Sequence, residues 1–293
     1  MAQNKMEHYP VMKEKVLELL NTKEGGIYVD ATSGYGGHSK YILENSAKNI
    51  FLYCIDKDND AIENLKRNLI EFKNFKAIKG GFENLTEILK NENVKKIDGI
   101  IFDLGFSIHQ IKNPERGFSF SVDGPIDMRY DIEQNLNAKE ILNKWAAKDL
   151  IYIFKNYGEI KNAERIVSKI IERRKKIEFE TTREFADFIS SITHRERKKI
   201  HPATKFFMAL RIATNNEFAN LKDGLNQAVN LLKENGRIIV ITFHSLEDRI
   251  VKRFLKNRDD IKIITKKVII PDEEEIRKNP ESRSAKLRAG EKK

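Results

Sequence analysis

Three aspartates that could bind a ligand or accept a proton each close an apolar segment in the first part of the chain. They are Asp30, Asp56 and Asp103. If these segments are parallel strands, their carboxyl ends meet at one edge of a sheet, where doubly wound folds bind ligands. A carboxylate at that edge can accept hydrogen bonds from hydroxyl and amino groups and can take up a proton. One such acid would mean little, whereas three in successive strands favour a functional site.

A glycine-rich turn follows the first of these segments and opens a helix. Gly34, Gly36 and Gly37 let the backbone approach a ligand at the mouth of that helix, which favours a nucleoside-bearing cofactor. Read alone, a Gly-x-Gly pattern is as typical of a tight turn without a ligand. Asp56 follows Gly36 by 20 residues, the spacing at which an acid binds ribose hydroxyls, with capping of the next helix as the alternative.

The residue at position 39 separates two cofactor classes. A dinucleotide loop needs a third glycine or alanine there, so that the helix packs closely beside a pyrophosphate, and this chain has Ser39. S-adenosylmethionine has no phosphate, so this requirement disappears. Farther along, Phe82 follows two glycines after the third apolar segment and is suited to stacking on an adenine. The sequence therefore favours S-adenosylmethionine over a nicotinamide cofactor.

The elements that must position these residues alternate between strand and helix. Apolar strand-like segments are predicted at residues 27–30, 50–55, 75–78, 97–103, 237–243 and 261–270. They predict an α/β fold with a doubly wound, mostly parallel sheet. Residues 112–203 lack strand signal and predict an inserted helical domain, which leaves 1–111 and 204–293 as one discontinuous domain. A helix around Phe207, Leu210 and Ile212 is expected to return to the sheet, and Ser245 is expected to cap the helix after the fifth strand.

Composition limits the class of protein. The 293 residues are 40% hydrophobic, enough for a substantial core, and no run of 18 apolar residues occurs. The N-terminus has no signal or transit character, so we expect a cytoplasmic protein without a membrane partner. The one cysteine, Cys54, excludes an internal disulfide and a cysteine metal cluster, and no metal site is predicted.

An excess of basic residues points to a polyanionic partner. Lys and Arg number 54 against 44 Asp and Glu, which gives a formal charge of +10. Clusters at 173–176 and 195–199 could bind phosphates, and a solvated helix surface is an equal alternative.

Longer blocks of sequence resemble the bacterial MraW/RsmH family. In order along the chain these blocks are 8–11, 30–39, 103–107, 114–120, 123–129, 201–204, 211–215, 243–252 and 282–288. Members of that family methylate the exocyclic N4 of a cytidine in the decoding region of small-subunit ribosomal RNA. One departure is Ile108-His109, where the family usually has Ser-Pro.

The resemblance implies a class I, Rossmann-like methyltransferase with S-adenosylmethionine as cofactor. It places Gly36, Gly37 and His38 at the methionine end. Asp56 would bind the ribose, Phe82 would contact the adenine, and Asp103 and Gln110 would complete the site. The helical insertion is similar to the family's RNA-recognition domain. The implied partner is small-subunit ribosomal RNA, with the assembled subunit favoured over naked RNA and both left open, as is a homodimer.

The chemistry of such a reaction calls for a hydrogen-bond and proton acceptor. The N4 amine of cytosine is a poor nucleophile, and methyl transfer leaves it with a proton to lose, so catalysis is positioning plus proton acceptance. We assign the acceptor role to Asp103, with Ser107, and weigh against it a contact of Asp103 to the cofactor's amino group only. The residues expected to cradle the base are His8, Asp127, Arg129, His201, Asn215 and His244.

Other reactions fit the sequence less well. Methylation at cytosine C5 needs a cysteine nucleophile, and Cys54 lies within a predicted strand. A nicotinamide-dependent oxidoreductase is disfavoured by Ser39. A catalytically inactive RNA-binding assembly factor is disfavoured by the joint presence of the glycine loop and the three aspartates.

Overall fold

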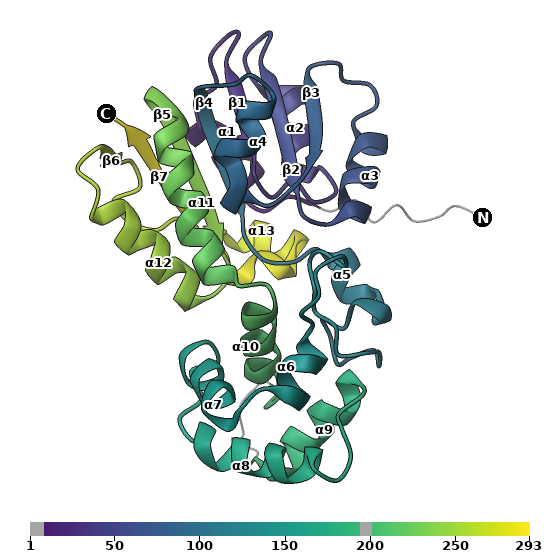
Figure 1. The fold of residues 1–293 in the computed structure, drawn as a ribbon. Coiled ribbons are helices and arrows are strands. Elements are labelled where there is room, and N and C mark those ends of the chain that lie inside the picture. Colours follow the sequence, from purple (N-terminus) through teal and green to yellow (C-terminus); the bar gives the residue numbers. More distant parts are fainter. Residues whose placement is uncertain (1–8, 194–200) are drawn as a thin grey trace. The chain divides into compact units, whose positions relative to one another are not determined.

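The computed structural model describes residues 9–193 and 201–293, which form two compact units. The first unit takes in the described residues up to Gly105 and from Phe218 onward, and the second runs from Phe106 to Glu217. Figure 1 shows the chain leaving the first unit after β4 and re-entering it at α11. The second unit is therefore an insertion, and it is longer at both ends than the predicted segment 112–203.

The first unit is built on a seven-stranded sheet in the order β3-β2-β1-β4-β5-β7-β6. Its strands are β1 (Ile27–Asp30), β2 (Phe51–Asp56), β3 (Phe75–Lys79), β4 (Ile97–Asp103), β5 (Leu232–Thr242), β6 (Ile261–Ile263) and β7 (Lys286–Lys292). The first five are parallel, and β7 is antiparallel to both β5 and β6. The strand order reverses between β1 and β4, which is where a doubly wound sheet opens a ligand crevice.

Helices cover both faces of this sheet. They are α1 (Lys13–Leu20), α2 (Gly37–Asn45), α3 (Asn59–Asn68), α4 (Leu85–Asn91), α11 (Glu217–Leu231), α12 (Ser245–Lys256) and α13 (Glu273–Lys278), with short 3-10 turns at Phe82–Asn84 and Pro280–Ser284. One buried cluster joins the sheet to α4, α11 and α12, and another joins it to α1, α2 and α3. Alternate strand residues belong to opposite clusters, as Val29 and Tyr28 do, because successive side chains point to opposite faces.

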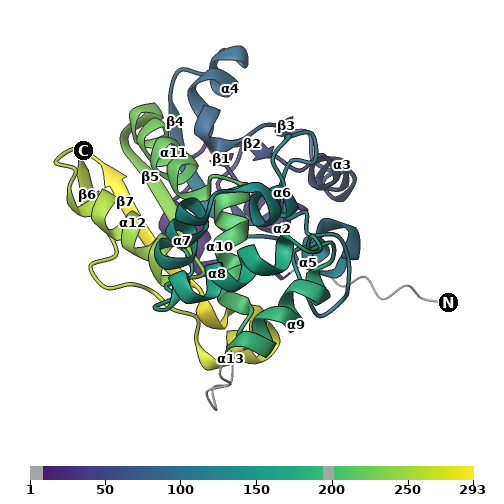
Figure 2. The same cartoon turned by 60° about the horizontal axis from the view of Figure 1, so that its bottom comes forward.

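The second unit is helical and has its own core. It contains α5 (Ile108–Lys112), a 3-10 turn at Pro114–Arg116, α6 (Ala138–Lys144), α7 (Ala147–Asn156), α8 (Ala163–Arg174), α9 (Thr182–Ile192) and α10 (Thr204–Thr214). Helix α10 packs on α6 and α7, and α7 packs on α8 (Figures 1 and 2). Phenylalanines on α7, α9 and α10 meet edge to face in the centre.

The helix at 204–214 corrects one expectation. Phe207 and Leu210 were expected to return the chain to the sheet, yet both are buried in the core of the second unit. Their apolar side faces α6 and α7 instead. Helical periodicity shows which side of a helix is buried but not which core buries it, so the chain rejoins the sheet only with α11.

The segment predicted as a strand at 261–270 is a strand only over Ile261–Ile263. The Thr265 hydroxyl accepts the backbone N–H of Ala289 at 2.9 Å, the donor that would otherwise continue the ladder to β7. Pairing returns at one isolated bridge between Ile269 and Leu287. A side chain has thus taken a backbone position in the ladder and ended the strand.

Across residues 9–193 and 201–293, no helix has both the length and the apolar character needed to cross a membrane.

Candidate active site

The glycine loop between β1 and α2 leaves room above its backbone. Gly34 and Gly36 have φ angles of +49° and +89°. Residues other than glycine adopt such angles only at a cost in free energy. A Cβ added at Gly34 would meet no atom within 4 Å. Two backbone bonds anchor the loop to the sheet, from Ala31 N to Ile101 O at 2.9 Å and from Ser33 N to Ile55 O at 3.0 Å. The loop is therefore fixed at its base and open where a ligand would lie.

Asp30 lies beneath this loop and is fully engaged by it. Its Oδ2 accepts the Ser39 hydroxyl at 2.7 Å, and its Oδ1 accepts the Thr32 amide at 3.3 Å. Burial raises the pKa of Asp30, while the His38 ring and these donors oppose the rise. Ser39, which occupies the position of the third glycine, thus has a positive role: it ties α2 to the end of β1.

Asp56 binds the other side of the same loop. Its Oδ2 accepts the Gly34 amide at 2.7 Å and its Oδ1 accepts the Asp58 amide at 2.9 Å. Each carboxylate oxygen can accept more than one hydrogen bond, so capacity is left for two ribose hydroxyls. Helix α3 is capped by Asp58, which accepts from Asp60 N at 3.0 Å. The alternative of Asp56 as that helix cap is thereby excluded.

His38 and Asp103 meet at the carboxyl end of β4. Nε2 of His38 lies 3.5 Å from Oδ2 of Asp103. Nε2 of His38 and Oδ1 of Asp103 are both buried and make no hydrogen bond within the described part of the chain. The backbone of Asp103 is fixed by its N–H, which donates to the Thr32 hydroxyl at 2.6 Å. Buried polar atoms without partners mark a place where a polar ligand group would be stabilised.

Phe82 lies at the end of β3, where an adenine contact was predicted. Its ring meets Phe102 edge to face, with centroids 5.5 Å apart, and a Cβ added at Gly224 would lie 2.7 Å from it. It is half-buried against the core cluster on the α4 and α11 side of the sheet. One part of the Phe82 ring therefore packs against the core, and the rest is available to contact an adenine.

Ser107 and Gln110 lie in the second unit and hold each other. The Ser107 hydroxyl accepts the Gln110 amide at 3.2 Å, and the Gln110 side chain accepts the Ser107 amide at 3.0 Å. This reciprocal pair is a capping box that starts α5. It fixes the start of the helix that carries Ile108-His109, where this chain departs from the family pattern.

Three of the residues expected to cradle a base also shape one loop of the second unit. Asp127 and Arg129 form a bidentate pair, with Nε–Oδ1 and Nη2–Oδ2 distances of 2.9 and 2.7 Å. Buried Asn215 donates to Met128 O at 2.7 Å and accepts Tyr130 N at 2.8 Å. Because Met128 has a φ of 61°, these contacts hold a conformation that the backbone alone disfavours.

The predicted histidines are placed differently from one another. His201 lies in the second unit, with its ring centroid 4.6 Å from that of Phe120 and its Nδ1 accepting Ala203 N at 3.2 Å. His8 lies outside the described residues, as does the basic cluster 195–199.

His244 belongs to the first unit and caps α12, the role expected of Ser245. Its Nδ1 faces the Glu247 amide at 3.4 Å, and the Glu247 carboxylate accepts Phe243 N at 3.0 Å. The cap is therefore one residue earlier than the expected Ser245, and Glu247 completes a capping box by accepting the His244 amide at 3.4 Å. A histidine nitrogen can accept a backbone N–H as a serine oxygen does, which standard cap patterns overlook.

The cluster at 173–176 is partly structural. Arg174 donates to Leu142 O at 2.7 Å and Trp145 O at 2.6 Å, at the end of α6. Arg173 binds Glu184 and lies over the Phe179 ring. These two cations hold helices of the second unit together. The cluster therefore has fewer cations available to bind phosphates than its sequence indicates.

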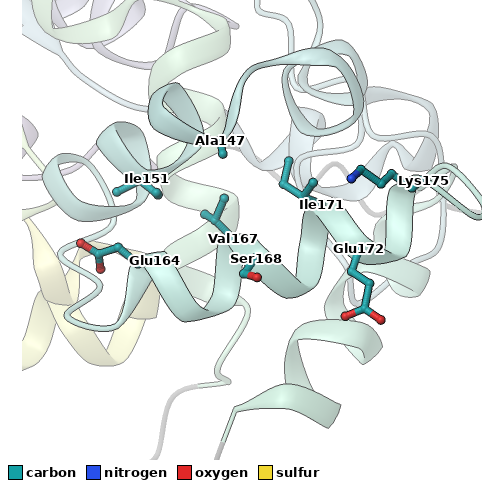
Figure 3. A pocket seen from close by; sticks show the side chains of 8 residues that line it. All are labelled: Ala147, Ile151, Glu164, Val167, Ser168, Ile171, Glu172 and Lys175. Carbon is teal, nitrogen blue, oxygen red and sulfur yellow. The ribbon is translucent and has the colours of Figure 1, made fainter.

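A groove of about 490 Å³ runs between α7 and α8 in the second unit (Figure 3). It is lined by the apolar Ile151, Val167 and Ile171 and by the charged Glu164, Glu172 and Lys175. None of the predicted site residues lines it, so it is separate from the glycine-loop site.

The segment before α1 is fixed by contacts to residues near the end of the chain. The Glu275 carboxylate accepts the amide of Met12 at 2.6 Å, where Met12 has a φ of 51°. Asn279 donates to Tyr9 O at 3.1 Å. Both contacts join residues more than 260 positions apart, and no local pattern reports such a pairing. Thr32, by contrast, lies within the block 30–39 that resembles the family, so its place beside the glycine loop was predictable from sequence.

The arrangement in the first unit fits S-adenosylmethionine. Asp30, Asp56 and Asp103 surround the loop, so a pyrophosphate would meet three carboxylates, whereas the sulfonium and ammonium of S-adenosylmethionine carry positive charge. The unpartnered oxygen of Asp103 suits the amino group, Asp56 suits the ribose, and the open space at Gly34 admits the chain between them. Fold and site together define a class I methyltransferase that uses S-adenosylmethionine.

Comparison with known proteins gives the family. The sequence matches the MraW methylase family over residues 5–293, and the chain belongs to that family. "Ribosomal RNA small subunit methyltransferase H" of Persephonella marina is 47% identical over 289 residues, covering 97% of this chain and 98% of its own. The protein of that name from a Sulfurihydrogenibium species is 46% identical over 291 residues, covering 97% and 99%. The crystal structure of Aeropyrum pernix fibrillarin with S-adenosylmethionine bound is similar with a TM-score of 0.43 at 10% identity, covering 95% of this chain and 72% of that one.

Proposed function

We propose that this enzyme transfers the methyl group of S-adenosylmethionine to the exocyclic N4 of a cytidine in the decoding region of small-subunit ribosomal RNA. The observation that carries the proposal is the 47% identity, over nearly the whole of both chains, to a small-subunit ribosomal RNA methyltransferase. Family membership over residues 5–293 agrees with it. The substrate is the cytoplasmic small subunit in its assembled form.

The cofactor residues are assigned from the geometry of the first unit. Asp56 accepts the ribose hydroxyls with the oxygen capacity that Gly34 and Asp58 leave unused. Gly36, Gly37 and His38 face the methionine end, and Phe82 packs beside the adenine. Asp30 lies beneath the glycine loop and holds it by accepting hydrogen bonds from Ser39 and Thr32. Gln110, in the second unit, is also proposed as a cofactor contact.

Asp103 is the acceptor for the amine. When bound, S-adenosylmethionine supplies an electrophilic methyl group. The carboxylate accepts a hydrogen bond from the N4 amine, orients its lone pair and takes the proton that the amine loses. Thr32 fixes the backbone of Asp103, and His38 lies against its other oxygen, so the acceptor is held in place before substrate arrives. A contact to the cofactor's amino group alone is the competing role.

The residues proposed to cradle the base lie in both units. In the second unit, Asp127, Arg129 and Asn215 give the loop from Met128 to Gln134 its shape, and Arg129 reaches the carbonyls of Ile132 and Gln134 at 2.8 Å. These residues are proposed to cradle the base, and their contacts set the shape of the loop that would do so. Ser107 is proposed to assist Asp103 as acceptor, and His8, His201 and His244 are proposed to help cradle the base.

The burial of Cys54 favours N4 over C5 of cytosine as the methylated atom. C5 methylation requires a thiolate that attacks the ring. Cys54 is fully buried in β2, burial raises the pKa of its thiol, and its Sγ lies 3.3 Å from the Ser39 hydroxyl. A protonated thiol beneath the loop cannot serve as that nucleophile.

The test is methyl transfer to unmethylated small subunits with labelled S-adenosylmethionine, followed by mapping of the modified base. We expect label on N4 of one decoding-region cytidine, and none with Asp103→Ala. Label on C5, or on RNA outside the small subunit, would contradict the proposal. Thermal stabilisation by the cofactor without methyl transfer to any RNA would favour an inactive assembly factor.

A further inference from the structure

Glu83 follows Phe82 in the 3-10 turn after β3, and only one oxygen of its carboxylate has a partner. Oε1 of Glu83 lies 2.5 Å from Nζ of Lys57. Oε2 is buried and makes no hydrogen bond within the part of the chain that the structure describes. The two side chains are 20% and 23% exposed, so a ligand can reach the pair. A buried carboxylate oxygen without a donor is costly, and a donor on a ligand would remove that cost.

The turn that carries Glu83 is held by α11. The Gln227 side chain donates to the backbone carbonyl of Glu83 and accepts the Thr86 amide at 2.8 Å. Helix α11 comes close to the turn at Gly224, where an added Cβ would lie 2.7 Å from the Phe82 ring and 3.1 Å from its carbonyl oxygen. These contacts use the backbone of Glu83. Its carboxylate can therefore be removed without removing what holds the turn.

Gly81 leaves the space in which this carboxylate lies. A Cβ added at Gly81 would collide with Oε2 of Glu83 and with Cε of Lys57. Lys57 directly follows Asp56, the candidate for binding the ribose, and the Gly80 amide donates to the carbonyl of Asp56 at 2.8 Å. The ends of β2 and β3 are thus joined, and the Glu83 carboxylate lies next to the end of β2 that holds Asp56.

The order of the strands indicates which part of the cofactor reaches Glu83. Along the carboxyl edge of the sheet, Asp103 ends β4, the glycine loop follows β1, Asp56 ends β2 and Glu83 follows β3 (Figure 1). S-adenosylmethionine consists of methionine, ribose and adenine joined in that order. With the methionine end at Asp103 and the glycine loop, and the ribose at Asp56, the adenine falls at the end of β3.

The chemistry of a carboxylate suits the amino group of adenine. Adenine carries an N6 amino group, which is a donor, whereas guanine and hypoxanthine carry an O6 acceptor at the same place. An ionised carboxylate only accepts hydrogen bonds, so it attracts the first and repels the second. Packing of a base on the Phe82 ring does not distinguish bases, because every base has an aromatic face. The acceptor next to that ring is the group that can.

We propose that Glu83 selects the base of the cofactor, and that its Oε2 accepts a hydrogen bond from the N6 amino group of adenine. This inference rests on the proposed cofactor site and deepens it by naming the group that recognises the adenine. The hydrogen bond is charge-assisted and gives the buried oxygen its missing donor. Lys57 is a positioning residue, which holds the carboxylate through Oε1 and leaves Oε2 for the ligand.

The test measures binding rather than activity. Two ligands are titrated by calorimetry: S-adenosylhomocysteine and its analogue with hydrogen in place of the N6 amino group. The variant is Glu83→Ala. The matched control is Glu87→Ala, which removes an exposed carboxylate four residues farther on, in α4. Melting temperatures of the proteins without ligand check that both variants fold.

We expect the wild type and Glu87→Ala to bind S-adenosylhomocysteine about 10- to 150-fold more tightly than the analogue, the factor that a hydrogen bond to a charged group supplies. Glu83→Ala should weaken S-adenosylhomocysteine by the same factor and leave the Kd of the analogue unchanged, so that the two ligands bind equally. A preference that persists in Glu83→Ala, or an equal loss for both ligands, would overturn the assignment. A wild type that binds neither ligand would instead contradict the cofactor site itself, and this inference with it.

Discussion

Nε2 of His38 lies 3.5 Å from Oδ2 of Asp103, which brings the first turn of α2 against the last residue of β4. The two residues are 65 positions apart in the chain, and the order β1-β4 in the sheet is what joins them. Both have a buried polar atom without a hydrogen bond in the described residues. The strongest candidate for catalysis is therefore also the place where the protein alone leaves polar groups unsatisfied.

Asp103→Asn keeps the shape of the side chain and removes its charge. If Asp103 accepts the proton of the amine, kcat should fall by about 10²- to 10⁴-fold, with a smaller change in the Kd of S-adenosylhomocysteine. Steady-state methyl transfer and isothermal titration measure the two quantities. If Asp103 only contacts the cofactor, KM for S-adenosylmethionine rises and the wild-type kcat returns at saturation, which contradicts the acceptor role.

Cofactor affinity should depend on pH through Asp56. Burial raises the pKa of this carboxyl from its ordinary 3.8 to about 6, although the Gly34 and Asp58 amides oppose the rise. The folded protein thus holds the proton more tightly than the unfolded chain does, and Asp56 alone makes stability fall as pH rises from 3.8 to about 6. Ribose hydroxyls bind the ionised form better, so the Kd of S-adenosylhomocysteine should rise as pH falls below about 6, by at most about tenfold per unit.

Titration calorimetry of the wild type and of Asp56→Asn across pH 5 to 8 checks this dependence. The amide variant should bind more weakly and lose the pH dependence below about 6. The same pH profile in both proteins would show that another group is responsible.

Ser39→Ala removes the donor that Asp30 holds at 2.7 Å in a buried site. The carboxylate would keep only its longer bond from Thr32 N, so we expect a loss of about 1 to 3 kcal/mol in stability. The melting temperature of the apoprotein measures it. Ser46→Ala is the matched control, because that hydroxyl has only a 3.4 Å contact to Ala47 O. Equal melting temperatures for the two variants would exclude a holding role for Ser39.

Asn215→Ala should loosen the loop that contains Met128 and Tyr130. The substitution removes the acceptor for Tyr130 N and a donor to Met128 O. Hydrogen exchange at the Tyr130 amide should therefore accelerate by one to two orders of magnitude, since roughly 1 to 3 kcal/mol of local stabilisation is lost. Asn156→Ala is the control, because Asn156 is exposed and donates only to Tyr152 O within its own helix. Unchanged exchange at Tyr130 would mean that the loop does not depend on Asn215.

The parallel part of the sheet could be predicted because its signals are local. Strands at 27–30, 50–55, 75–78 and 97–103 are short apolar runs closed by polar or turn residues, and the structure has β1 to β4 at these places. The last aspartates of β1, β2 and β4 stand at one edge because parallel strands all end there. Topology, rather than any feature of a single residue, made that edge predictable.

The features that sequence could not give depend on partners far along the chain. Nothing local shows that α10 packs on α6 and α7, or that the Thr265 hydroxyl takes a ladder position from β7. The pairing of Asp127 with Arg129, two residues apart, was also not expected from their residue types. In each case the residue types were read correctly as polar or apolar, but their partners are set by tertiary packing.

The insertion between β4 and β5 has a consequence for synthesis on the ribosome. β4 pairs with β1 on one side and with β5 on the other, yet β5 begins only at Leu232. At about 5 to 20 residues per second, the apolar edge of β4 stays unpaired for roughly 6 to 26 s while the helical unit is made. Such an edge can template pairing with another nascent chain. The contacts of the helical unit lie within one continuous stretch of the chain, so this unit can fold before β5 is made. Its folding would shorten the flexible chain that separates β4 from β5, and β5 would then pair sooner after it emerges.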